Sequence, residues 1–293
     1  MLGCKCDVGL SNTGKPNCVT LQSVTSKLIM VALEDSTGVK NFVDVTSLPT
    51  WNSLINQSDA SKRWFPLPIF ENVELPKADS TFEEAPSGRK QFIRQGKRSF
   101  AGELWSETPQ LLGKINSNRC VEFGVYVVDV NGNLIGSKEG DKVYPIPVDN
   151  QSFEAKLMFA TDTTVQKIMV GFDWYRLFDE ASLWLITPEE SGVDFNELEG
   201  LLDVNFKEVS HTVSELVAKL TLDYGTAVNP LQVKGLLLAD FTAIDSTGAS
   251  VSVSAVTSVV NEYTLTFATQ TVGTVLTVTA KKDGYIGSYT FTV

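Results

Sequence analysis

Short runs rich in Val, Thr, Phe and Tyr, separated by turn residues, are the dominant pattern of this chain. Residues 251–254 and 276–279 alternate apolar and polar side chains, which is typical of strands with one buried face. The run at residues 121–130 is followed by Asn131-Gly132-Asn133, the clearest hairpin turn of the chain. The pattern therefore predicts a mainly β protein, with further strands at residues 26–34, 41–45, 153–160, 165–174, 204–209 and 212–223.

Helical patterns are short and few. Residues 49–57 can place Trp51, Leu54 and Ile55 on the apolar side of one short helix. Thr108 followed by Pro109 is typical of an N-cap with proline at the first helical position, so a helix is expected to about Ile115. Residues 195–202 can form a third short helix. No run of about 18 apolar residues occurs, so no membrane-spanning helix and no membrane partner are expected.

The composition changes near residues 225–230. From Leu231 onward the chain has no Trp, Cys, His or Arg, and Thr, Val, Ser and Ala dominate. Several short strands in this stretch indicate a small immunoglobulin-like (Ig-like) sandwich, without the Cys and Trp that mark antibody domains. We therefore predict an irregular N-terminal arm at residues 1–20, a β-rich main body at 21–225 and an Ig-like β-sandwich domain at 226–293.

The chain of 293 residues is acidic, with 24 Lys and Arg against 35 Asp and Glu, a formal net charge of −11. Residues from Thr226 onward hold three Lys and four acidic residues, so residues 1–225 carry −10 of that charge. Such a surface repels nucleic acid rather than binding it, and it also favours solubility. The balance of 43% hydrophobic and 20% charged residues is that of a folded protein rather than a disordered one.

Catalytic and metal-binding signatures are weak. His211 is the only histidine, and it lies between two expected strands, so it is more typical of a turn residue than of a catalytic base. No Gly-rich phosphate loop follows a strand and opens a helix. Cys4, Cys6 and Cys18, with Cys120 as the only other cysteine, do not have the spacing of common zinc sites. We expect no enzyme, no cofactor and no bound metal.

The first residues, Met1-Leu2-Gly3-Cys4, lack the basic and apolar segments of a signal peptide, so we expect synthesis in a reducing cytoplasm. Three acidic pairs, Glu83-Glu84, Asp179-Glu180 and Glu189-Glu190, adjoin turns or prolines and are expected in solvated loops. A hydrolase would need two of them across a cleft.

Aromatic side chains leave a second function open. Trp174, Tyr175 and Trp184 could line a sugar site, although aromatics beside strong strands more often belong to a core or an interface. A carbohydrate-binding or adhesive β-sandwich surface protein is therefore the alternative to the main expectation, which is a non-enzymatic structural subunit of a larger assembly.

One basic run stands out in this acidic chain. Arg89, Lys90, Arg94, Lys97 and Arg98 are interleaved with Phe92, Ile93 and Phe100. Such a pattern can bind a nucleic-acid backbone. It also suits an arm that docks on an acidic neighbouring subunit, and this interpretation is favoured because the rest of the same chain is acidic.

Three segments together resemble structural proteins of crAss-like tailed bacteriophages: the small C-terminal β-domain, the segment at residues 82–104, and the opening Gly3-Cys4-Lys5-Cys6-Asp7-Val8-Gly9-Leu10-Ser11-Asn12-Thr13-Gly14. In such phages, rings of protein stack beneath the portal and form a short tail. The resemblance implies a tail-tube-like β-sandwich or barrel body with an Ig-like decoration.

The resemblance also implies partners and a location. It suggests a homo-oligomeric ring, 12-fold or 6-fold, in the virion tail, next to portal or other tail ring proteins. DNA would pass through as cargo during genome ejection, and an acidic wall would limit its adhesion. The protein would be made in the host cytoplasm.

Overall fold

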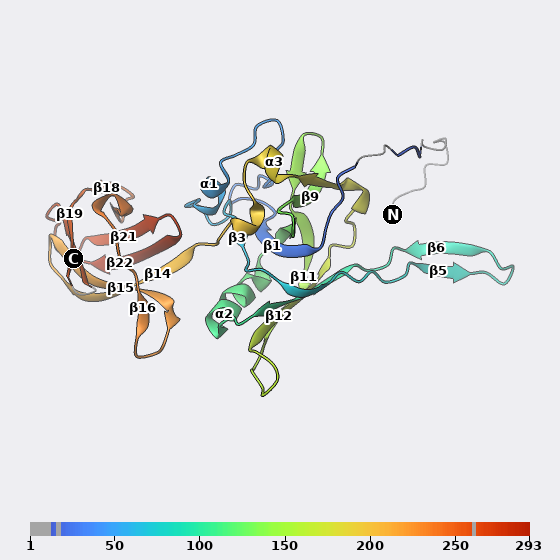
Figure 1. The fold of residues 1–293 in the computed structure, drawn as a ribbon. Coiled ribbons are helices and arrows are strands. Elements are labelled where there is room, and N and C mark those ends of the chain that lie inside the picture. Colours follow the sequence, from blue (N-terminus) through green and yellow to red (C-terminus); the bar gives the residue numbers. More distant parts are fainter. Residues whose placement is uncertain (1–12, 16–18, 260–261) are drawn as a thin grey trace.

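The computed structural model describes residues 13–15, 19–259 and 262–293, and it is mainly β with a few short helices (Figure 1). Two β-rich units follow one another along the chain, and a thin two-stranded hairpin projects from the first of them (Figure 1). Residues 1–12 and 16–18 include most of the expected N-terminal arm and lie outside the described residues, as do Cys4, Cys6 and Cys18.

The first unit, here called the body (residues 19–201), is built on an eleven-stranded sheet within the described residues. Its main path runs β2-β10-β9-β8-β11-β12-β7-β4, and β1 pairs with both β8 and β3 while β13 pairs with β9. The strands are β1 (Thr25–Ala32), β2 (Val43–Asp44), β3 (Phe65–Pro66), β4 (Glu71–Glu74), β7 (Ser99–Trp105), β8 (Phe123–Asp129), β9 (Leu134–Glu139), β10 (Lys142–Tyr144), β11 (Ile146–Met158), β12 (Lys167–Trp174) and β13 (Leu183–Ile186).

The body buries apolar side chains on both faces of its central strands. Every residue of β8 is buried, and the side chains of β8 divide between two separate apolar clusters. Tyr126 is 0% exposed, and its hydroxyl donates to the carbonyl of Val143 at 2.9 Å, which satisfies the buried polar atom. The hairpin expected after β8 is present, since the Asp129 carboxylate accepts hydrogen bonds from the backbone N–H groups of Asn131 and Asn133.

The helices are α1 (Trp51–Ile55), α2 (Pro109–Ser117) and α3 (Pro188–Ser191), with single 3-10 turns at Asn118–Cys120, Glu180–Ser182, Phe195–Glu197 and Leu238–Asp240. The predicted N-cap of α2 is confirmed, because the Thr108 hydroxyl accepts a hydrogen bond from the N–H of Leu111 and Pro109 opens the helix. The helix expected at residues 195–202 is only a 3-10 turn.

The second unit, here called the Ig-like unit (residues 202–293), has nine strands among its described residues. One sheet runs β14-β15-β20-β19 and the other β22-β21-β17-β18, and β14 also pairs in parallel with β22. This is the strand order of an immunoglobulin sandwich, with β14 as its first strand. The strands are β14 (Leu202–His211), β15 (Glu215–Gly225), β16 (Pro230–Gln232), β17 (Phe241–Asp245), β18 (Ser250–Val251), β19 (Val253–Val259), β20 (Glu262–Phe267), β21 (Val275–Lys282) and β22 (Tyr285–Thr292).

The structure moves the domain boundary that the composition predicted. β14 and β15 lie before residue 226, yet Val204, Leu216 and Leu220 belong to the buried core of the Ig-like unit. The boundary therefore lies near residue 201, because residues that share one buried core belong to one unit. The change of composition at residues 225–230 occurs inside the sandwich, between β15 and β16, which pair with each other.

A charged contact joins the two units. Lys114 of α2 reaches Asp203 of β14 at 2.7 Å and Asp223 of β15 at 3.0 Å. The Nζ of Lys281 also donates to the hydroxyl of Ser58 at 2.9 Å. The shared core corrects the expected spans of the body and the Ig-like domain to residues 19–201 and 202–293. The expected mainly β class with few short helices is confirmed.

Candidate functional site

The projecting hairpin is formed by β5 (Thr81–Glu84) and β6 (Lys90–Arg94), and it is here called the arm (residues 79–95). It continues the pairing of β4 with β7 outward from the body (Figure 1). Its tip is closed by hydrogen bonds from Ala85 N to Arg89 O at 2.9 Å and from Gly88 N to Ala85 O at 2.8 Å. Gly88 has φ of +79°, a conformation that favours glycine, and with Pro86 and Ser87 it forms the turn that closes the hairpin.

The arm has no support from either core. Its strands form a sheet of their own, and every residue from 81 to 95 is exposed. Phe82 and Phe92 are 54% and 57% exposed, and their rings meet edge to face with centroids 5.7 Å apart. Ile93 follows them in sequence and is also 54% exposed. The arm therefore carries large apolar side chains in water, on a two-stranded hairpin that is only marginally stable by itself.

The basic run does not make the arm basic. The arm carries three positive charges on and beside β6 and three negative charges on and beside β5, namely Arg89, Lys90 and Arg94 against Asp79, Glu83 and Glu84. Lys90 faces Glu84 across the hairpin with 3.8 Å between charged atoms. The electrostatic reason for docking on an acidic body, or on nucleic acid, is thereby weakened, because the positive strand is neutralised by its own partner.

Three members of the predicted assembly arm belong to the body instead. Phe100 is 1% exposed and stacks on Phe172 at 4.9 Å between ring centroids. Arg98 pairs with Glu180 at 3.0 Å, and Lys97 pairs with Asp173. Their closeness in sequence to β6 predicts a place on the arm, and this prediction is wrong, because they lie where the chain re-enters the body and meets Phe172, Glu180 and Asp173.

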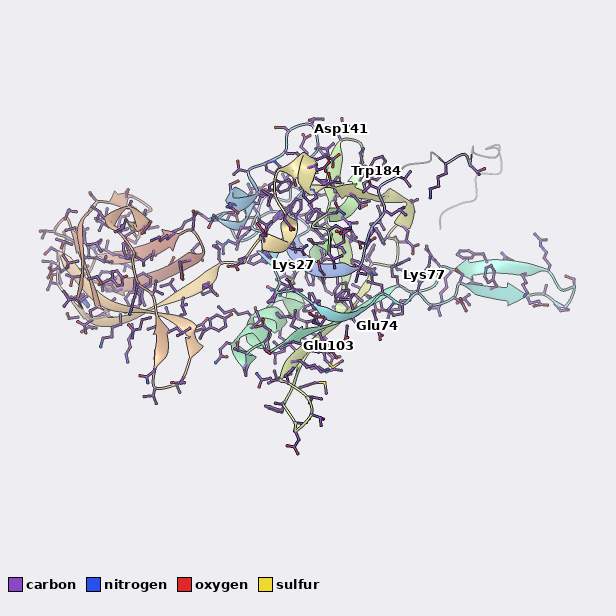
Figure 2. All side chains as sticks on the ribbon, in the orientation of Figure 1. Lys27, Glu74, Lys77, Glu103, Asp141 and Trp184 are labelled. Atoms are coloured by element: carbon purple, nitrogen blue, oxygen red, sulfur yellow. The ribbon has the colours of Figure 1, made fainter. Side chains whose placement is uncertain are left out.

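These ion pairs hold the root of the arm. Lys77 is labelled in Figure 2, where the chain leaves the body toward the arm, and it lies opposite Arg98 on the returning strand. Its Nζ lies 2.9 Å from the carboxylate of Glu180. Together with Arg98 it holds the pKa of the Glu180 carboxyl below its usual range. A Cβ on Gly96 would lie 1.6 Å from the carbonyl oxygen of Ala78, so only glycine fits where the two strands approach. The sequence names Asp179-Glu180 as an acidic pair for a solvated loop, but it gives no sign that Glu180 pairs with Lys77, because the two residues are 103 positions apart.

A cleft of about 270 Å³ lies beside the root. Its walls include the aromatic residues Trp174, Tyr175 and Phe178, together with Asp149 and Arg176. The indole N–H of Trp174 is buried and has no hydrogen-bond partner among the described residues. Two of the three aromatics proposed for a sugar site thus share one cleft. Trp184 does not line it, and its exposed ring instead lies under Lys138 Nζ, 4.0 Å from the ring centre.

The other sequence candidates have structural roles. His211 closes β14, where its Nδ1 lies 2.8 Å from Glu208, and that hydrogen bond lowers the pKa of the Glu208 carboxyl. Glu190 completes a capping box with Thr187 at the start of α3. Cys120 is exposed and forms no disulfide with any described residue.

Within the residues that the structure describes, no three His, Cys, Asp or Glu side chains are grouped to hold a metal ion. In the same part of the chain, no helix is long and apolar enough to cross a membrane. Comparison with protein-family models, with curated proteins and with solved structures found no match to this chain.

Proposed function

We propose that this chain is a non-catalytic structural subunit that assembles with further copies of itself, and that the arm is its assembly element. One observation carries the proposal: the arm extends from the body with no side chain of residues 81–95 buried. An isolated two-stranded hairpin is marginally stable in water, so a fixed arm with exposed aromatic rings is best explained by a partner that covers it.

The energy available to such a contact is considerable. Fully burying a Phe side chain stabilises a complex by about 1.5–3 kcal/mol, and the arm offers Phe82, Phe92 and also Ile93. A single exposed ion pair adds only about 0–1 kcal/mol. The apolar side chains should therefore provide most of the affinity, and the charges should select the partner and its orientation.

A ring in the tail of a tailed bacteriophage is the assembly that we propose. The resemblance of three segments to crAss-like phage structural proteins supports it, as does the net charge of −11, which suits a wall past which DNA moves without adhering. Head-to-tail contacts close into rings when the rotation allows, and we propose a 6-fold or 12-fold ring beside portal or other tail ring proteins. The subunit would be made in the host cytoplasm and would act in the virion.

Removing the arm tests this function. Residues 80–94 are replaced by a short Gly-Ser turn, and the wild-type and shortened chains are compared by native mass spectrometry and electron microscopy. Wild type should form closed rings, and the shortened chain should stay monomeric with an unchanged circular dichroism spectrum and melt, because the arm contributes to neither core. A wild-type chain that stays monomeric at high concentration, or a shortened chain that still forms rings, contradicts the proposal.

The cleft supports a second candidate function, carbohydrate binding. Aromatic walls beside Asp149 and Arg176 can stack on a sugar ring and bond its hydroxyls. Glycan-array binding by wild type that is lost in Tyr175→Ala, and retained in Trp184→Ala outside the cleft, would favour this candidate. Equal binding by both variants, or none by wild type, would exclude the cleft as a sugar site.

A further inference from the structure

The two strands of the arm carry opposite charges. β5 ends in Glu83 and Glu84, and β6 begins with Lys90 directly after Arg89. Within one hairpin, the antiparallel register places Glu84 opposite Lys90 and Glu83 opposite Gln91. An acidic strand and a basic strand therefore lie side by side, and each strand keeps one edge without a partner among the described residues.

These two free edges are open to pairing with another strand. β5 and β6 contain no proline. Every residue of both strands is exposed, which shows that no described element covers their outer sides. A free edge with unpaired N–H and C=O groups is a template for strand addition. The arm thus presents one acidic edge and one basic edge on opposite sides of the same narrow sheet.

We propose that the partner of the arm is the arm of another copy, with β6 of one copy paired antiparallel to β5 of the next. This inference rests on the proposed assembly function and names its contact. In this pairing the arms repeat the cross-strand arrangement that each hairpin already has, so Glu84 of one copy lies near Lys90 of its neighbour. Phe82 and Phe92 lie opposite each other in the hairpin, so the same repetition places Phe92 of one copy beside Phe82 of the next.

Charge decides between the ways in which two arms can meet. β5 holds no positive side chain, so pairing β5 with β5 gives Glu83 and Glu84 no opposite charge in either strand direction. β6 holds no negative side chain, and antiparallel pairing of β6 with β6 centred on Phe92 places Lys90 opposite Arg94. Like charges directly opposite one another on neighbouring strands are destabilising. Only β6 against β5 joins opposite charges, and that contact uses different surfaces on the two copies. Such a contact propagates from copy to copy and ends only when a ring closes, which removes every free edge.

A charge swap tests this pairing. The swapped variant carries Glu83→Lys, Glu84→Lys, Arg89→Glu and Lys90→Glu, so its own hairpin keeps one acidic and one basic strand. It should assemble with itself as wild type does. When it is mixed with wild type carrying a heavy-isotope label, acidic edges meet acidic edges and basic edges meet basic edges. Native mass spectrometry should then show mixed rings depleted roughly tenfold relative to random mixing, since several unfavourable pairs add at each contact.

Two half-swapped variants sharpen the test. Glu83→Lys with Glu84→Lys makes both strands basic, and Arg89→Glu with Lys90→Glu makes both acidic. Each variant alone should fail to assemble, and a mixture of the two should form rings in which they alternate. High salt should reduce the discrimination between wild type and the swapped variant, because exposed charges are screened.

The outcomes separate this inference from the proposed function. If wild type forms rings but mixes freely with the swapped variant, arm-to-arm pairing is wrong while ring assembly stands. If the swapped variant folds but does not assemble, the arm docks on another surface, such as the acidic body. If wild type forms no oligomer, or the arm-deleted chain assembles equally well, the proposed function fails and this inference fails with it.

Discussion

The hairpin β14–β15 and the hairpin β5–β6 are built in the same way and end in opposite environments. Both are antiparallel, and both have charged side chains along their strands. In β15 every second side chain enters the core, and Leu216, Ala218 and Leu220 are at most 1% exposed. In β5 and β6 no side chain is buried.

This difference shows that pairing two strands does not by itself decide their stability. β15 gains a second neighbour, β20, and an opposite sheet that covers Leu220. The arm gains neither, so its aromatic rings are exposed to water. The first hairpin is therefore part of a folding unit, and the second is an exposed hairpin that we propose to be covered by another copy.

The largest expected effect comes from cutting the chain at the two candidate boundaries. A chain ending at residue 201 should be soluble and melt cooperatively, because Phe195 and Leu198 complete the body core before β14 begins. A chain ending at residue 225 keeps β14 and β15 without their covering sheet and should aggregate. Solubility and thermal melts of both chains provide the measurement. If the longer piece is the better behaved, β14 and β15 belong to the body.

Two single substitutions compare the hairpins directly. Leu220→Ala removes a side chain that is 1% exposed and should lower the free energy of unfolding of the Ig-like unit by about 2–5 kcal/mol. Phe92→Ala on the arm should change the free energy of unfolding by less than about 0.5 kcal/mol, since its ring contacts no core, yet should weaken assembly. Chemical denaturation and native mass spectrometry measure the two effects. A Phe92→Ala variant that is strongly destabilised but still assembles would reverse the comparison.

The smallest effect concerns the charged contact that fixes β14–β15 to the body. The hydrogen bond from Lys114 lowers the pKa of the Asp223 carboxyl below its ordinary value of 3.8. A depressed carboxyl pKa stabilises the fold above the unfolded value, and this contribution is lost as the pH falls through the lower folded value. Both side chains are partly exposed, so the contact is worth about 1 kcal/mol or less.

Acid should therefore remove part of what the Lys114 contact contributes. Between pH 6 and pH 3, wild type should lose more stability than Lys114→Met. In that variant Asp223 has no ion pair with residue 114 that protonation could break. Lys156→Met is the matched control, because its pair with Glu154 is exposed and 3.7 Å long, and it should follow wild type. Thermal melts at both pH values measure the difference, and equal losses in wild type and Lys114→Met would show that the contact is neutral.

Local chemistry made much of the fold predictable from the sequence. Asp35-Ser36-Thr37-Gly38 and Asp245-Ser246-Thr247-Gly248 lie in different units and form the same turn. In each, the aspartate accepts hydrogen bonds from the N–H and the hydroxyl of the threonine, at 2.8 and 2.6 Å. The aspartate also accepts a hydrogen bond from the backbone N–H four residues on, so five consecutive residues contain the bonds that this turn needs. The N-cap of α2 was predictable for the same reason, since Thr108 and Leu111 are three positions apart.

The pairing of opposite charges across the hairpin could also have been predicted from the sequence. Pro86-Ser87-Gly88 is rich in turn-forming residues, and folding its two flanks together places Glu84 opposite Lys90. The charge of the run by itself does not reveal this neutralisation, because strand pairing brings together residues that are separated in the sequence.

The tertiary structure alone decided which apolar residue of one short run is core and which is surface. Phe92 and Phe100 lie eight residues apart in similar basic surroundings, and Phe100 is buried because the fold brings Phe172 of β12 and Phe70 against it. Arg98 is likewise held by Glu180, which is 82 residues away. Short-range hydrogen bonds specify turns and caps from neighbouring residues, whereas burial and ion pairing depend on partners that only the folded chain brings within contact distance.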